Sequence, residues 1–336
     1  MILVTGSTGL VGSHLLYKLI SSGESVRAIY RNEQKLVNVK NVFSYYTDNY
    51  TNLFESIEWV KADILDIPSL TDAFNGITYA YHCAAFVSFE PDKYQLLRRT
   101  NIEGTANIVN LCISNAVKKL CYVSSIATLG HPYNSLPITE ETEWNPEVVN
   151  NVYAITKYGA EMEVWRGTQE GLNAIIVNPG VILGAGIWRY GSGSLFKKAH
   201  NGLKYYTSGS IGLVDVEDVV FAMIALTKSD VSNERFILIA ENWTFKDFLQ
   251  AMAISVHASP PNKIAPQWLL QIAWRLDWLT HKLTRKRRRL TKHLVMSLSS
   301  KKTYNTTKIK SYLNFEFKKI NECITEIGQL YLKQVQ

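Results

Sequence analysis

The chain opens with a short apolar run that leads directly into three regularly spaced glycines. Residues 2–4 fit a buried parallel strand, and Gly6, Gly9 and Gly12 follow at intervals of three. Apolar residues then recur at helical spacing as far as Gly23, so the glycines occupy a strand-to-helix turn. The free N–H groups at the start of such a helix can bind phosphate. The pattern therefore predicts a fold that begins with a β-turn-α unit.

Each glycine has a separate expected role. Gly6 allows the tight turn, Gly9 lets the backbone approach a pyrophosphate, and Gly12 lets the helix pack closely on the strand. An ordinary glycine-rich turn is the alternative, which a motif opening at the start of the chain disfavours. The dinucleotide contacts predicted in this motif are Gly6, Ser7, Thr8, Gly9, Leu10, Val11 and Gly12.

The second predicted strand, at 25–31, indicates which dinucleotide is bound. An NAD-selective site usually has an acidic residue at its end, but Tyr30 and Arg31 stand there and Lys35 follows. Because arginine forms bidentate bonds with phosphate, we expect NADP(H), with NAD as the alternative and a solvated surface Arg31 as the competing interpretation. Further predicted cofactor contacts after the third and fourth strands are Asp63, Ile64, Ala84 and Ala85.

A second motif, Tyr-Ala-Ile-Thr-Lys at 153–157, suits proton transfer. Tyr153 and Lys157 are four residues apart, so they share one face of a helix. A phenol with a pKa near ~10 becomes more acidic beside an ammonium group. Ser124 and Ser125 follow an apolar strand, at the edge where doubly wound folds bind ligands. Alone, the Tyr–Lys spacing is typical of a solvated helix face; with the glycine motif it favours acid–base chemistry.

These motifs together resemble the extended branch of the short-chain dehydrogenase/reductase superfamily, over nearly the whole chain. In that family's pattern the catalytic Ser or Thr lies five residues before a glycine, here Gly130, which selects Ser125. The resemblance implies that Tyr153 and Lys157 are the catalytic pair, and that Lys157 also binds the nicotinamide ribose. It implies that Asn101 holds the helix geometry or a proton-relay water. It also places Pro179 and Gly180 against the nicotinamide.

Within the superfamily, residues 26–31 and 205–216 resemble the dihydroflavonol-reductase and 3β-hydroxysteroid-dehydrogenase group. That likeness implies NADP(H)-dependent reduction of a carbonyl, or oxidation of the alcohol, in a hydrophobic small molecule. A nucleotide-sugar epimerase or dehydratase with retained NAD is an alternative, although residues 178–186 depart from its pattern. A non-catalytic dinucleotide-binding regulator is another. The expected substrate contacts are Phe86, Phe89, Thr128, Asn178, Trp188 and Tyr190.

Strand-like and helical runs alternate through the first half of the chain, which predicts an α/β fold with a Rossmann-type, doubly wound parallel sheet. We expect a dinucleotide-binding domain over 1–180, to which segments near 211–240 return. Residues 181–336 should form mainly a smaller substrate lobe and C-terminal helices. Residues 43–56 lengthen one connection without an evident function.

Composition excludes several other classes. A chain of 336 residues with 46% hydrophobic and 19% charged residues is globular rather than disordered. Its four cysteines form no CxxC pair and its histidines no metal-binding spacing, so we expect a reduced, cytoplasmic enzyme without a metal. Because the first strand is predicted to begin at residue 1 or 2, we expect no signal peptide. We expect a monomer or homodimer that does not bind nucleic acid.

Residues 266–289 form two apolar stripes that run into a cationic segment. Leu269, Ile272, Leu276, Leu279 and Leu283 follow one stripe; Leu270, Trp274 and Trp278 follow another. We expect both stripes to be buried in the substrate lobe. The alternative is peripheral contact with a membrane surface, since tryptophans beside the basic run Arg285–Arg289 suit an interfacial helix. The charged residues disfavour a spanning helix.

Overall fold

The computed structural model describes residues 1–130, 137–285, 288 and 290–335. Seven parallel strands form its main sheet, in the order β10-β6-β5-β4-β1-β2-β3. The strands are β1 (Ile2–Thr5), β2 (Val26–Tyr30), β3 (Glu58–Lys61), β4 (Tyr79–His82), β5 (Lys119–Val123), β6 (Ala174–Pro179) and β10 (Glu234–Leu238). The strand order reverses beside β1, which creates the crevice where doubly wound sheets bind ligands.

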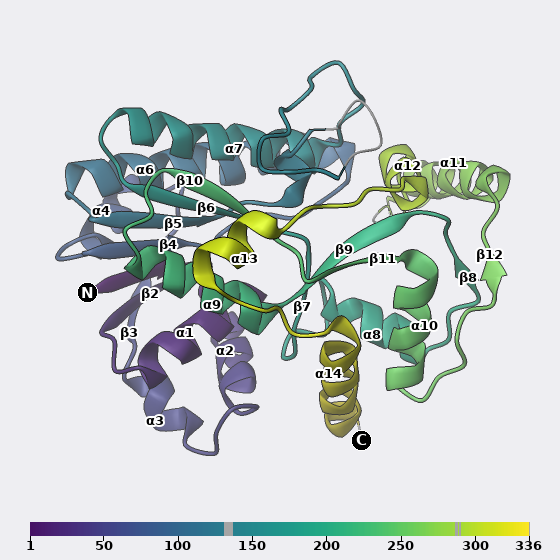
Figure 1. Cartoon of the computed structure of the whole chain (residues 1–336), viewed down its shortest axis with the longest axis horizontal. Coiled ribbons are helices and arrows are strands. Elements are labelled where there is room, and N and C mark those ends of the chain that lie inside the picture. The colour runs from purple at the N-terminus through teal and green to yellow at the C-terminus, as the bar shows by residue number, and fades with distance from the viewer. Residues whose placement is uncertain (131–136, 286–287, 289, 336) are drawn as a thin grey trace.

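Helices cover both faces of this sheet (Figure 1). Leu3 and Val4 point into different hydrophobic clusters on the two faces, as alternation along a buried strand requires. The predicted doubly wound parallel sheet is therefore confirmed. One face carries α1 (Leu10–Ser21), α2 (Leu36–Phe43), α3 (Tyr50–Glu55) and α9 (Val216–Lys228); the other carries α4 (Ile67–Ala73), α6 (Gly104–Ser114) and α7 (Val152–Gln169).

Short helices lie in the connections between the main strands. They are η1 (Glu33–Lys35), η2 (Pro91–Lys93), α5 (Tyr94–Leu97), η3 (Arg98–Glu103) and η4 (Ile126–Thr128).

A smaller lobe is built around the three-stranded sheet β11-β9-β7. The lobe comprises β7 (Val181–Leu183), α8 (Gly193–His200), β8 (Tyr205–Tyr206), β9 (Ser210–Asp215), β11 (Glu241–Thr244), α10 (Phe245–Ser255), β12 (Lys263–Ile264), α11 (Gln267–Thr284), α12 (Lys292–Ser299) and α14 (Ile320–Val335). Helix α13 (Thr307–Leu313) instead packs on the main sheet, through Ile309 and Leu313. Within the range 211–240, β9 belongs to this small sheet. Strand β10 is part of the main sheet, and α9 packs on one face of the main sheet.

The connection at 43–56 packs between the two parts of the chain. Tyr46 stacks on Tyr17 of α1, with ring centroids 4.1 Å apart, and its hydroxyl lies 2.5 Å from Nδ1 of His14. Nε2 of His14 lies 3.1 Å from the carbonyl oxygen of Ala185. Burial lowers the pKa of His14 to about 4, so its imidazole is neutral near pH 7. The insertion thus joins α1 to the start of the smaller lobe.

The prediction for α11 was wrong in one respect. We expected both apolar stripes to be buried, but no residue of this helix is buried. Residues of the second stripe, Leu270 and Trp274, are partly covered, whereas Ile272, Leu276 and Leu279 of the first stripe are exposed. Three residues of the basic run, Lys286, Arg287 and Arg289, lie outside the described residues.

Candidate active site

The turn between β1 and α1 has the geometry that a pyrophosphate requires. Gly6 has φ +66°, and a Cβ there would lie 2.5 Å from the amide nitrogen of Ala84. A Cβ on Gly12 would lie 2.3 Å from the carbonyl oxygen of Gly6. Gly9 is the residue directly before α1, and among the described residues no side chain caps the start of this helix. The first helical N–H groups, including those of Leu10, are therefore available to an anion.

The hydroxyl groups of this turn support the loop. Ser7 Oγ donates to the carbonyl oxygen of Ile29 on β2 at 2.6 Å, and Ser13 Oγ donates to the carbonyl oxygen of Gly9 at 2.7 Å. Ser7 is buried, whereas Thr8 and Val11 are half-buried at the turn. We therefore assign any contact of Ser7 with a phosphate to its backbone.

The structure brings two predicted cofactor residues together at the ends of β2 and β3. Arg31 Nη1 lies 3.6 Å from Asp63 Oδ2, and the Arg31 side chain is 65% exposed. Lys35 is exposed in η1. Ile64 packs beside Gly104 of α6, and its carbonyl oxygen accepts a bond from Asn107 Nδ2 at 2.9 Å. The backbone of Ile64 is thus held by α6.

Behind the turn, the end of β4 is held by hydrogen bonds to its neighbours. The amide of Ala84 donates to Thr5 Oγ1 at 3.2 Å, and Ala85 is exposed. His82 Nδ1 lies 2.7 Å from Thr5 Oγ1 and its Nε2 lies 2.9 Å from Thr105 Oγ1. Burial lowers the pKa of His82 to about 3. His82 is therefore a neutral buried link between β1, β4 and α6.

Tyr153 and Ser125 meet where the first turn of α7 faces the end of β5. Asn151 caps α7, accepting a bond from the amide of Ala154 at 2.8 Å. Ser125 Oγ accepts a bond from the amide of Ala127 at 3.1 Å. Burial raises the pKa of Tyr153, and its side-chain hydrogen bond with Ser125 opposes that rise. We expected Lys157 to lower this pKa; the structure instead gives a net increase caused by desolvation.

Lys157 is buried beneath the same strand end. Its Nζ donates to the hydroxyl of Tyr122 at 2.6 Å and to the carbonyl oxygen of Val123 at 2.8 Å. Burial lowers the pKa of Lys157 to about 7, while the charge of Glu161 acts in the opposite direction. Ser125, Tyr153 and Lys157 therefore gather around the carboxyl end of β5.

Asn101 fixes the segment after β4. It lies on a π-helical turn, η3, a feature that often occurs at functional sites. Its Oδ1 accepts from the amide of Phe86 at 2.7 Å, and its Nδ2 donates to the carbonyl oxygen of Phe86 at 3.0 Å. Nδ2 also lies 3.2 Å from Thr156 Oγ1. These bonds fit the geometric role expected of Asn101.

One wall residue lies beside the predicted acid. The ring of Phe89 meets that of Tyr153 edge-on, with centroids 5.5 Å apart. Phe89 is 38% exposed, so an apolar surface stays open next to the phenol. Phe86 is half-buried. The segment that Asn101 holds therefore supplies aromatic surface at the site.

Two predicted substrate contacts, Thr128 and Asn178, are turned into a buried network instead. Thr128 Oγ1 and Asn178 Nδ2 lie 2.7 and 2.9 Å from Oε2 of Glu161. Ser124 Oγ donates to the same oxygen at 2.5 Å, and Arg235 Nη1 donates to Oε1 at 3.1 Å. The side chains of Thr128 and Asn178 are both buried, so we no longer expect these two residues to touch substrate.

Glu161 is a residue that we did not select from the sequence. It lies four residues after Lys157, on the same face of α7, and its side chain is fully buried. The Tyr-x-x-x-Lys-x-x-x-Glu spacing was the available signal. Through Asn178, whose Nδ2 also lies 3.2 Å from the carbonyl oxygen of Ser125, this carboxylate supports the loop that carries Ser125.

Two further predicted substrate contacts, Trp188 and Tyr190, lie in the smaller lobe. Trp188 packs against Phe196 and Tyr331 and donates to Gln334 Oε1, so it belongs to the core of the lobe and not to a free wall. Tyr190 is 48% exposed.

The loop after β6 is also held by backbone packing. Pro179 ends β6, and the amide of Gly180 donates to the carbonyl oxygen of Leu238 at 3.1 Å. A Cβ on Gly180 would lie 2.4 Å from the carbonyl oxygen of Gly212. Glycine at 180 is therefore required by the approach of β9.

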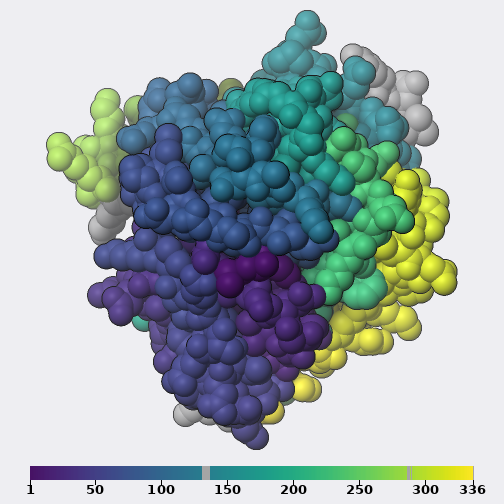
Figure 2. Space-filling view, turned by 90° about the vertical axis from the view of Figure 1, so that its left-hand side faces the viewer, coloured from purple at the N-terminus to yellow at the C-terminus, as the bar shows by residue number. Residues whose placement is uncertain are grey.

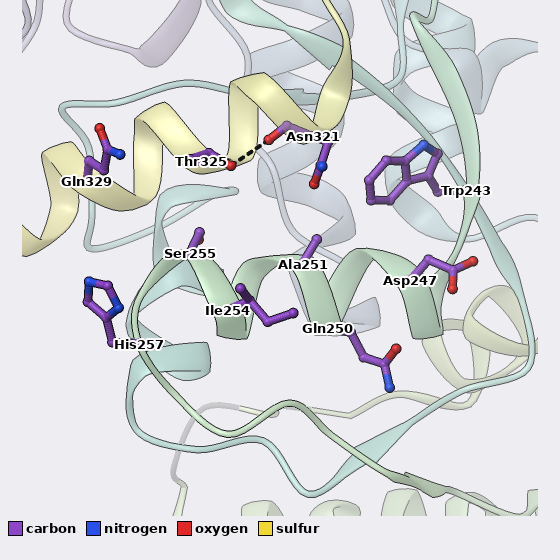
Figure 3. Close-up of a pocket in the computed structure, with 10 residues that line it drawn as sticks. All are labelled: Trp243, Asp247, Gln250, Ala251, Ile254, Ser255, His257, Asn321, Thr325 and Gln329. Carbon is purple, nitrogen blue, oxygen red and sulfur yellow. Dashed lines mark hydrogen bonds between the residues drawn. The ribbon is translucent and has the colours of Figure 1, made fainter.

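Outside this region, a groove of about 620 Å³ runs between α10 and α14 (Figure 3). Its lining includes Trp243, Asp247 and Asn321, and none of the predicted site residues. Within the described ranges, no group of three or more His, Cys, Asp or Glu is arranged to hold a metal ion.

Comparison with known proteins identifies the family. The model of the NAD dependent epimerase/dehydratase family matches residues 2–239. The chain belongs to this family. A putative dihydroflavonol 4-reductase of Synechocystis is 29% identical over 282 residues, covering 81% of this chain and 77% of that protein. Sterol demethylase protein B of Methylococcus capsulatus is 27% identical over 305 residues, covering 89% and 88%.

A solved structure extends the likeness across the whole fold. UDP-glucose 4-epimerase of Thermotoga maritima, determined with UDP-glucose, has a TM-score of 0.76 and 21% identity, covering 100% of this chain and 99% of that one. At this identity the likeness concerns the fold. The predicted resemblance to the extended short-chain dehydrogenase/reductase family and its reductase group is confirmed. The chain is a Rossmann-type member of an NAD-dependent enzyme family.

Proposed function

We propose that the chain is an NADP(H)-dependent oxidoreductase that reduces a carbonyl, or oxidises the alcohol, of a hydrophobic small molecule. The observation that carries this proposal is the gathering of Ser125, Tyr153 and Lys157 at the end of β5. In the reductive direction, Ser125 donates a hydrogen bond to the carbonyl oxygen and Tyr153 donates a proton to it. The glycine turn would hold NADPH, which would supply the hydride.

The end of β2 supports the choice of NADP(H). Tyr30 and Arg31 stand where an NAD-selective site would carry a carboxylate. Arg31 is mostly exposed, and its contact with Asp63 at 3.6 Å is loose. The guanidinium can therefore turn to a 2′-phosphate, which it would bind in a bidentate manner.

Two observations support a hydrophobic substrate. Phe89 leaves apolar surface open beside Tyr153. The relatives named dihydroflavonol 4-reductase and sterol demethylase protein B carry names that refer to polycyclic compounds. A polycyclic ketone or aldehyde is thus the substrate class that we propose.

The second candidate is a nucleotide-sugar epimerase or dehydratase that retains NAD. The family description and the fold shared with a UDP-glucose 4-epimerase favour it. A non-catalytic regulator would not need a hydrogen-bonded Ser125–Tyr153 pair beside a buried lysine, so that alternative has less support.

The test is to measure NADPH and NADH oxidation by the purified chain against aldehydes, ketones and steroid ketones. We expect turnover with NADPH that falls about 10²–10⁴-fold in Tyr153→Phe, with unchanged NADPH binding. Tyr158→Phe is the control, because Tyr158 on the same helix stacks on Trp144. Copurified NAD with interconversion of UDP-sugars would establish the second candidate, and full activity in Tyr153→Phe would refute the proposed acid.

A further inference from the structure

Helix α11 carries an apolar face that the rest of the chain leaves exposed. Trp268, Ile272, Leu276, Leu279 and Leu283 follow each other at spacings of four, four, three and four residues. At about 100° per residue they fall within an arc of about 80°. Each of these side chains is between 45% and 75% exposed. This set of five residues is called the apolar arc below.

The opposite face of α11 packs toward the segment that leads into α12. Asp277 Oδ2 accepts a bond from the amide of Leu290 at 3.2 Å and lies 3.8 Å from Nε of Arg288. Leu270 and Trp274 are partly covered on this side. Figure 1 places α11 beside α12 at the rim of the molecule, and Figure 2 shows yellow-green atoms of this segment projecting beyond the main body. The apolar arc therefore faces outward from a helix that is already anchored.

Cations border the apolar arc. Arg275 and Lys282 fall within about 40° of its edge, and both are exposed. Each lies over a tryptophan ring, Arg275 over Trp274 at 4.6 Å and Lys282 over Trp278 at 5.3 Å. From residue 266 to residue 292 the sequence contains eight Lys or Arg and a single acidic residue. The segment that contains the arc is thus strongly positive in sequence.

We propose that α11 docks on a membrane surface that contains anionic lipid. The apolar arc would lie at the boundary between headgroups and acyl chains, with the cations against lipid phosphates. The helix is about 27 Å long, enough to lie along the interface. Among the residues that the structure describes, no helix has the length and apolar character to cross a membrane. Docking would therefore be peripheral.

Charge favours lipid over a second copy of this chain. A twofold contact through the arc would bring the same cations of both copies together, and like charges repel at close range. Anionic lipid instead offers apolar chains and negative charge in the geometry that the helix presents. Helix α11 also lies at the rim of the molecule, where a broad surface can reach it (Figure 1).

The test is flotation of the full chain with vesicles of phosphatidylcholine alone or mixed with phosphatidylserine. We expect binding to the mixed vesicles that weakens as salt rises. Leu276→Ser should weaken it about tenfold, and Arg275→Gln combined with Lys282→Gln about 30-fold. Ile254→Ser is the matched control, because Ile254 is 64% exposed on α10, and it should bind as the unaltered chain does.

Several outcomes would overturn the proposal. These are failure to bind mixed vesicles, equal weakening by Ile254→Ser, or a dimer by light scattering that Leu276→Ser converts to monomer. A rise in KM for an apolar substrate in Leu276→Ser without vesicles would also overturn it, because the arc would then cover substrate. If Leu276→Ser lost helical circular dichroism, the charge-changing pair would decide the matter alone.

Discussion

The ammonium group of Lys157 donates to the hydroxyl of Tyr122 at 2.6 Å. This bond, with a second to the carbonyl oxygen of Val123, attaches the cation to β5, the strand that leads into Ser125. Burial raises the pKa of Tyr122 well above its usual value, so the phenol remains a neutral acceptor. Helix α7 therefore contributes both Tyr153 and Lys157, while β5 leads into Ser125 and holds the amine of the lysine.

Burial of Lys157 makes its contribution to stability depend on pH. Its pKa is about 7 in the folded chain and 10.5 ordinarily. Between these values the unfolded chain binds more protons, so the free energy of unfolding rises with pH. Lys157→Met lacks this slope. We expect the stability of the variant, relative to the unaltered chain, to fall by about 3 kcal/mol from pH 6 to pH 9 in urea titrations.

Lys118→Met is the control for that experiment, because Lys118 is exposed. Its stability relative to the unaltered chain should not change across the same pH range. If the free energy of unfolding changed with pH in parallel for Lys157→Met and the unaltered chain, Lys157 would not titrate as a buried amine.

Arg31→Asp should shift cofactor preference from NADPH toward NADH. A charge-assisted bond to the 2′-phosphate is worth about 1.5–3 kcal/mol, so the ratio of kcat/KM values for NADPH and NADH should fall about 10- to 100-fold. Arg166→Asp is the control, because Arg166 pairs with Glu163 and Glu170 on α7. An unaltered ratio in Arg31→Asp would show that Arg31 does not contact the phosphate.

Glu161→Gln should destabilise the chain by about 3–5 kcal/mol, because it leaves Arg235 without its buried counter-charge. Denaturant unfolding measures the loss. Glu163→Gln, which removes a half-buried ion pair with Arg166 near the surface of the same helix, should cost no more than about 1 kcal/mol. Equal effects of the two substitutions would mean that the buried network contributes no special stability.

Phe89→Ala should raise KM for bulky apolar substrates by about 10-fold or more and leave KM for NADPH unchanged. The reason is that Phe89 presents open aromatic surface beside Tyr153. Phe221→Ala removes a ring of similar exposure on α9 and should alter neither constant. A change in kcat alone would instead indicate that Phe89 orients the phenol.

The local patterns predicted the main sheet and the glycine turn well. Strands expected at 1–5 and 119–124 are found at Ile2–Thr5 and Lys119–Val123, because buried parallel strands form continuous apolar runs. Gly12 was recognisable because the atoms that approach it, in Gly6 and Ser7, lie within the turn. Gly6 was recognisable from its place in the tight turn, although the atoms that approach it belong to Cys83 and Ala84. Information within about a dozen residues was sufficient for these features.

Features that depend on distant partners were not predictable in this way. Glu161 resembles a surface residue until Arg235, 74 positions later, is placed beside it. Asn178 lies near the end of β6 in the manner of a site residue, but its side chain hydrogen-bonds to Thr128 in a buried network. Trp188 has its partner, Gln334, in the last helix. For α11 both stripes were visible in the sequence, but which one faces outward depends on α12.

The return of the chain to the main sheet through β10 has a practical consequence. A fragment that ended near residue 180 would contain the glycine turn and all three proposed catalytic residues, yet β6 would become an open edge. Unpaired strand edges invite aggregation. The same truncation would remove Arg235 from the carboxylate of Glu161. A minimal cofactor-binding fragment of this protein must therefore extend at least through Leu238, the last residue of β10.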